Sequence, residues 1–134
     1  MKKYFLIIIL LLTGCFGEVG KGYITKKCTK EETINGYNKT TTIYLKSKQD
    51  EIEEIKIEET YDENIDLTSI NDSKKSEENL FRQIKGATIE INNNKFTYIV
   101  NPKESNDIIK EKFEIEESTH KQLKKYEEQG YACK

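Results

Sequence analysis

The dipeptide Asn35-Gly36 constrains the fold of this chain more than any other short feature. It lies between two segments rich in β-branched and aromatic residues, and both of its residues tolerate the positive φ angles of a type I′ turn. A two-residue turn fixes the pairing of the strands that flank it, because each strand residue then has one defined partner. Ile34 is expected opposite Tyr37, and Cys28 opposite Ile43. The sequence therefore predicts a β-hairpin that carries Cys28 on its apolar face.

Three further segments have the composition of strands, and turn residues separate them. They are Glu51–Tyr61, Thr88–Ile91 and Lys95–Val100. Asn92-Asn93-Asn94 lies between the last two and has the residues of a tight turn. The sequence therefore predicts a second hairpin after the third strand.

Two segments carry helix signals. Ser76–Lys85 begins with a residue that can cap a helix, continues with two glutamates, and is followed by Gly86. Its apolar side is expected to consist of Leu80, Phe81 and Ile84. The second helix is expected at Thr119–Gln129, which opens with a Thr-x-x-Gln capping box. Ile108–Ile115 fits either a helix or a strand. Together these elements predict an α+β fold, in which two helices pack on an antiparallel β meander.

The first residues of the chain have the order of a secretory signal. Two lysines precede the apolar run Tyr4–Leu12, which is too short to span a membrane. The segment Leu12-Thr13-Gly14-Cys15 follows it and resembles the lipobox of bacterial lipoproteins. That resemblance implies cleavage before Cys15 and attachment of diacylglycerol to its sulfur, usually with an acyl chain such as palmitate on the new amino terminus. Two or more acyl chains anchor a protein stably.

This interpretation divides the chain into a signal peptide (residues 1–14), a lipidated cysteine with a glycine-rich tether (residues 15–22) and one small domain (residues 23–134). Removing the signal and its two lysines leaves 20 basic and 24 acidic residues, a net charge of −4. Such a surface does not attract nucleic acid or anionic lipid headgroups. The lipid is therefore expected to hold the protein at the extracytoplasmic face of a cell membrane.

The remaining cysteines, Cys28 and Cys133, form an even pair in a chain predicted to reach an oxidising compartment. We predict a disulfide that joins the first strand to the C-terminal end. The alternative is two free thiols, one of them reactive. Neither cysteine belongs to a Cys-x-x-Cys motif or has an obvious basic cluster to lower its pKa.

Catalytic and metal-binding signals are weak. His120 is the only histidine and lies among polar residues, so an ordinary surface position is expected. Asp62–Asp66 matches the first half of a calcium loop, but Leu67 stands at the glycine position and Ser73 at the glutamate position. We therefore interpret Asp62–Asp66 as an acidic turn. The sequence identifies no catalytic residue, metal ligand or cofactor site.

A second resemblance rests on the lipobox cysteine, the strand–turn–strand opening, Thr60-Tyr61-Asp62 and the ending Gly130–Lys134. These features, with the length and order of elements, are similar to the small YehR-like lipoproteins, a bacterial family of unknown function. The resemblance implies a cell-envelope lipoprotein with an α+β domain and supplies no catalytic residues.

Two hypotheses follow for function. The first is a non-enzymatic binding module that is tethered to a membrane and recognises another envelope protein or a small ligand. The second is a thiol-based redox or envelope-stress sensor that uses Cys28 and Cys133. The second requires a labile disulfide.

Overall fold

The computed structural model describes residues 22–134, which form one antiparallel six-stranded sheet and three helices, an α+β fold. The strands are β1 (Tyr23–Ile34), β2 (Tyr37–Lys48), β3 (Glu51–Tyr61), β4 (Ala87–Asn92), β5 (Lys95–Val100) and β6 (Ala132–Cys133). The helices are α2 (Thr68–Gln83), α3 (Asp107–Lys112) and α4 (Thr119–Glu128). The predicted signal peptide, Cys15 and nearly all of the predicted tether lie outside the described residues.

The first hairpin has the register that its turn predicts. Ile34 pairs with Tyr37 and Cys28 pairs with Ile43. Asn35 and Gly36 both have positive φ, at 51° and 87°, as a type I′ turn requires. The predicted bounds of β3 and β5 are also confirmed.

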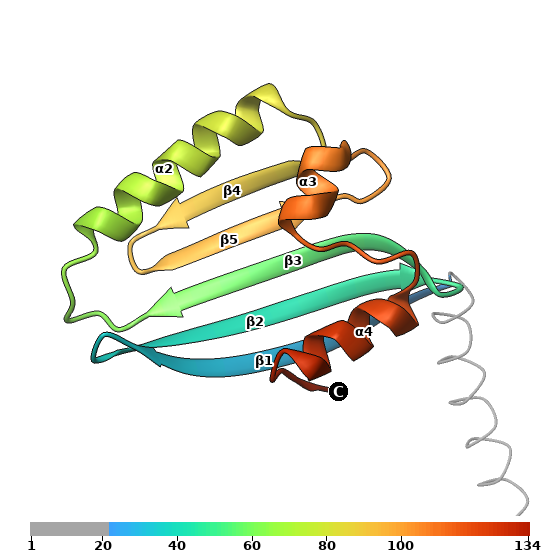
Figure 1. The fold of residues 1–134 in the computed structure, drawn as a ribbon, viewed down its shortest axis with the longest axis horizontal. Helices are drawn as coiled ribbons and strands as arrows, with labels where there is room; N and C mark the ends of the chain where they lie inside the picture. Colours follow the sequence, from blue (N-terminus) through green and yellow to red (C-terminus); the bar gives the residue numbers. More distant parts are fainter. Residues whose placement is uncertain (1–21) are drawn as a thin grey trace, which may run out of the picture.

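The strand order departs from a simple meander. β1, β2 and β3 follow one another, but β5 pairs with β3, β4 lies outside β5 at one edge, and β6 pairs with β1 at the other. The crossover from β3 to β4 contains α2, and Figure 1 shows α2 running beside β4. The sheet order is therefore β4-β5-β3-β2-β1-β6.

The helices differ from the prediction in number and in their starting points. Residues 22–134 contain three helices rather than two, and the ambiguous segment Ile108–Ile115 includes all of α3 except its first residue. α2 begins eight residues before the predicted cap, at Thr68, and Leu67 precedes it without a side-chain cap. Ser76 lies inside this helix, where its hydroxyl donates to the Asp72 carbonyl. Intrahelical bonding of this kind replaces the capping role that the sequence suggested.

The start of α4 also differs by one residue from the predicted capping box. Ser118 is the N-cap, and its hydroxyl accepts a hydrogen bond from the backbone N–H of Lys121. Gln122 is fully buried, and its side-chain oxygen accepts a bond from the Glu116 backbone N–H. The glutamine therefore holds the connection between α3 and α4 rather than capping the helix.

The core lies on one face of the sheet. Its fully buried members are Cys28, Leu45, Ile55, Phe96, Val100 and Ile109. Of the predicted apolar side of α2, Phe81 is buried and Ile84 packs against the core, but Leu80 is 40% exposed, so its inclusion was wrong. The ring of Phe81 lies 6.2 Å from the ring of Tyr98 in β5. In Figure 1, α3 and α4 lie in front of the sheet with a strip of β3 and β2 visible between them.

Candidate functional site

A cleft of about 370 Å³ opens over the middle of the sheet. β2 and β3 supply its floor, α2 and the end of α3 supply one wall, and the end of α4 with Tyr131 supplies the other. This volume is within the range of small-molecule binding sites. The cleft is therefore the candidate binding site of the described residues.

The floor changes from polar to apolar along its length. Side chains on one face of a strand recur every second residue, so Lys39, Thr41 and Ile43 of β2 all point into the cleft. On β3, Glu59 pairs across from Thr41, and Ile57 pairs across from Ile43. The connection between α3 and α4 crosses the sheet near the β2–β3 turn (Figure 1), beyond the apolar end of the floor.

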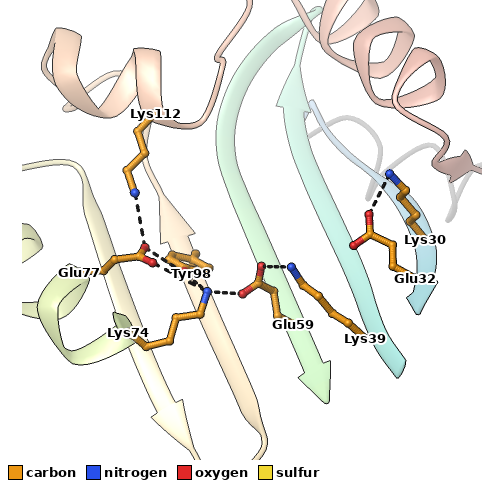
Figure 2. Close-up of polar contacts among 8 residues, drawn as sticks. All are labelled: Lys30, Glu32, Lys39, Glu59, Lys74, Glu77, Tyr98 and Lys112. Carbon is orange, nitrogen blue, oxygen red and sulfur yellow. Dashed lines mark hydrogen bonds and ion pairs between the residues drawn. The ribbon is translucent and has the colours of Figure 1, made fainter. Parts of the chain in front are cut away.

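A row of alternating charges crosses the polar part of the cleft (Figure 2). Lys112 Nζ lies 3.6 Å from Glu77 Oε2, and Lys74 Nζ lies 3.9 Å from Glu77 Oε1. Lys74 Nζ also donates to Glu59, whose second oxygen lies 3.1 Å from Lys39 Nζ. We call these five residues the charge row; it joins α3, α2, β3 and β2.

Tyr98 of β5 supports the middle of the charge row. Its hydroxyl accepts a 2.6 Å hydrogen bond from Lys74 Nζ and donates a 2.9 Å bond to Glu77. Burial raises the pKa of this hydroxyl, and the negative charges of Glu59 and Glu77 raise it further. Tyr98 therefore remains protonated and able to donate at every physiological pH.

Burial and neighbouring charges have opposite effects on the pKa values of Glu59 and Lys39. Burial favours the neutral form of Glu59, but Lys74 and Lys39 outweigh it and hold the pKa of Glu59 below its usual value. Burial likewise lowers the pKa of Lys39, but the charge and hydrogen bond of Glu59 bring it above its usual value. Both residues are therefore ionised at neutral pH.

Aromatic side chains line both walls of the cleft. The ring of Phe113, just after α3, lies 5.5 Å from the ring of Tyr98. On the other side, Tyr126 of α4 lies 5.7 Å from Tyr131. Lys30 Nζ lies 5.5 Å from the centre of the Tyr131 ring and 2.9 Å from Glu32. The cleft thus combines aromatic surface with paired charges.

The predicted disulfide between Cys28 and Cys133 is present, with a Cα–Cα distance of 4.0 Å. It joins β6 to β1, and β6 begins at the residue after Tyr131. The disulfide therefore holds in place the segment that forms one wall of the cleft. Cys28 is fully buried. The structure does not describe Cys15.

His120 and the acidic turn lie away from the cleft. His120 is exposed, and its backbone N–H donates to the Asp50 carboxylate. Asp62 accepts a bond from the Asn38 backbone N–H, and Asp66 accepts two bonds from Thr68. Among residues 22–134, no group of three or more histidine, cysteine or acidic side chains is placed to hold a metal ion. The helices of the same residues include none long and apolar enough to cross a membrane.

The sequence interpretation did not identify the charge row. One signal was available, because the predicted hairpin register places Lys39 on the same face as Ile43, and a charge on an apolar face needs a partner. Lys74 gave no such signal, since the helix that carries it was predicted to begin after it.

Comparisons with known protein families, with curated proteins and with solved structures found no match to this chain.

Proposed function

We propose that this chain is a bacterial lipoprotein, anchored through Cys15 to the extracytoplasmic face of a membrane, whose domain binds a ligand or an envelope protein in the cleft. The observation that supports the binding role is the cleft itself, which combines a floor that is apolar at one end, aromatic walls and a partly buried row of charges. Charges held in a partly dehydrated site act more strongly on a bound group than charges in water.

The anchor rests on the signal and lipobox at residues 1–15. The similarity to the small YehR-like lipoproteins supports the same location and adds no activity. With a tether of residues 15–22, the domain would lie close to the bilayer. We further infer that the helices cover one face of the sheet and leave the cleft open between them.

The non-enzymatic role is part of the proposal. The charge row pairs its carboxylates with lysines, and the Tyr98 hydroxyl, which donates to Glu77, is held protonated by burial and by the neighbouring negative charges. The cleft residues are arranged to hold a bound group rather than to transfer a proton or an acyl group.

The thiol-sensor hypothesis has less support. A sensing thiol has to be accessible and to have a lowered pKa. Cys28 has no exposed surface, and its partner lies in a strand that pairs with β1. The bridge therefore has the position of a structural crosslink.

Metabolic labelling with palmitate tests the anchor. The full chain is expected to take up the label and to fractionate with membranes, whereas Cys15→Ser should lose both. Cys28→Ser serves as the control, because it removes a cysteine that is not in the lipobox. Label retained in Cys15→Ser would contradict lipidation at this residue.

Site-specific photo-crosslinking tests the cleft. A photoreactive residue at Gln129, which is exposed and lines the cleft, should give a defined adduct in intact cells. The same residue at Thr88, which is exposed on β4 and does not line the cleft, is the matched control. No adduct at Gln129, or the same adducts at both positions, would contradict binding in the cleft.

A further inference from the structure

The charges in and beside the cleft balance one another once Lys30, the partner of Glu32, is counted. They are the carboxylates of Glu32, Glu59, Glu77 and Glu114 and the ammonium groups of Lys39, Lys74 and Lys112. Each has a partner within the protein: Glu32 pairs with Lys30, and the side-chain amide of Gln129 donates to Glu114. With Lys30 included, four positive charges face four negative ones.

This balance restricts the kind of ligand. Among the carboxylates that line the cleft, only the exposed Glu114 has an amide rather than a lysine as its partner. Elsewhere in the cleft, a ligand with a net charge would leave water without finding an unpaired opposite charge, and an uncompensated charge is costly to dehydrate. A ligand with one positive and one negative group can instead place each beside an opposite charge of the row, where both are attracted. Charge complementarity therefore favours a dipolar ligand with no net charge.

The floor restricts the ligand further. Ile43 and Ile57 lie side by side at the apolar end of the floor, whereas Lys39 and Glu59 lie at its polar end. Phe113 and Tyr126 also line the cleft. Ile43 is only 3% exposed, but Ile57 is partly exposed, so an apolar side chain that covers Ile57 would remove it from water, and such burial is favourable in proportion to its area. The ligand should therefore carry an apolar group as well as its two charges.

We propose that the cleft binds a short zwitterionic peptide or peptide-like amino acid, with its apolar side chain on Ile57 and its ammonium and carboxylate groups along the charge row. This inference rests on the proposed function, because it names the ligand class for the same cleft. The carboxylate would face Lys39, and the ammonium would face Glu32 or Glu77; these side chains keep some exposed surface.

NMR titration of the isotope-labelled mature chain tests the ligand class. The probes are the tripeptide Gly-Phe-Gly with free ends, its N-acetylated form, its C-amidated form, the doubly blocked form, and Gly-Gly-Gly. The free tripeptide is expected to bind most tightly and to shift amide signals of the cleft. Each single block should weaken binding about tenfold, because it removes one charge-assisted contact and leaves a net charge.

Two variants make the test specific to the charge row. Lys39→Met should weaken binding of the free tripeptide several-fold and leave binding of the doubly blocked form unchanged. Lys27→Met is the matched control, because Lys27 is exposed on the opposite face of the same hairpin, and it should change neither. Thermal unfolding of both variants establishes that each is folded.

Several results would overturn the ligand class. One is that either singly charged peptide binds more tightly than free Gly-Phe-Gly. Another is that the doubly blocked form or Gly-Gly-Gly binds as tightly as free Gly-Phe-Gly. The last is that no probe binds at 10 mM, which is roughly tenfold above the millimolar dissociation constant of a weak ligand. An adduct at Gln129 in cells together with any of these would leave the proposed binding function intact and exclude only the peptide-like ligand.

Discussion

The Cys28–Cys133 disulfide should contribute a large part of the stability of this domain. The bridge closes a loop with a sequence separation of 105 residues. In the chain-entropy model, a crosslink over a loop of about 100 residues stabilises the folded state by about 4.7 kcal/mol at 25 °C, because it restricts the unfolded chain. Small domains have a total unfolding free energy of roughly 5–15 kcal/mol, so the loss would be a third of it or more.

The structure supports a loss near this value. β6 contains two residues, and outside the disulfide it is held to β1 by its short ladder and by the bonds between Lys27 and Lys134. Few contacts therefore remain to keep the C-terminal segment in place once the bridge is cut. Tyr131 precedes β6 directly, so the wall of the cleft that contains it should loosen as well.

Urea unfolding of the oxidised chain, the reduced chain and the double variant Cys28→Ala/Cys133→Ala measures the effect. Both bridge-free forms are expected to unfold at about 2 M lower urea, given a slope of about 2 kcal/mol/M. The slope itself should increase, because the unfolded chain expands without its crosslink. The reduced wild type is the control for the buried sulfur of Cys28, which the double variant also removes.

A difference below about 1 kcal/mol between the oxidised and reduced chains would refute the loop-closure argument. It would mean that the unfolded chain stays compact around its C-terminal end without the bridge. Hydrogen exchange gives a local check, since reduction should increase exchange in β6 more than in β2.

Three further predictions concern the charge row and one turn. Lys74→Met should destabilise the fold by about 2–3 kcal/mol, as measured by urea unfolding. This is below the roughly 3–5 kcal/mol expected for breaking a fully buried pair, because Glu59 keeps Lys39 as a partner and 13% of its side-chain surface is exposed. Lys112 is more exposed, so Lys112→Met should cost under about 0.5 kcal/mol in the same assay. The lowered pKa of Glu59 means that the native state binds fewer protons than the unfolded state. The contribution of Glu59 to stability is therefore complete above about pH 4.3 and is lost as the pH falls through the folded pKa. Glu59→Gln should flatten the loss of stability between about pH 5 and pH 3, and an unchanged pH profile of stability would contradict the ion pairing of Glu59. Gly86→Ala should cost more than Gly36→Ala in thermal unfolding: both glycines have positive φ, but only at Gly86 would a Cβ meet backbone, 2.5 Å from Ser105 Cα.

Local chemistry made part of the fold predictable. The Asn35-Gly36 turn acts over two residues, so the pairing of β1 with β2 follows from the sequence alone. The parity of the cysteines and the predicted export were enough to pair Cys28 with Cys133. The bounds of β3 and β5 followed from alternation and flanking turns.

Other features depended on contacts between distant segments. Local patterns do not indicate that β5 rather than β4 pairs with β3, because that choice depends on which apolar surfaces meet when α2 crosses the sheet. The early start of α2 has a similar cause: Lys74 reaches Glu59 and Tyr98 only if the helix already extends through it, and such tertiary contacts outweigh a local cap signal at Ser76.

Almost all of the candidate site depends on contacts between residues that are distant in the sequence. The lipobox predicted at residues 12–15 is a hypothesis that rests on consecutive residues alone. Lys39, Glu59, Lys74 and Tyr98 come from four elements, and each has an ordinary neighbourhood in the sequence. Only the folded sheet brings them within ion-pair and hydrogen-bond distance, because in the unfolded chain water solvates each charge separately.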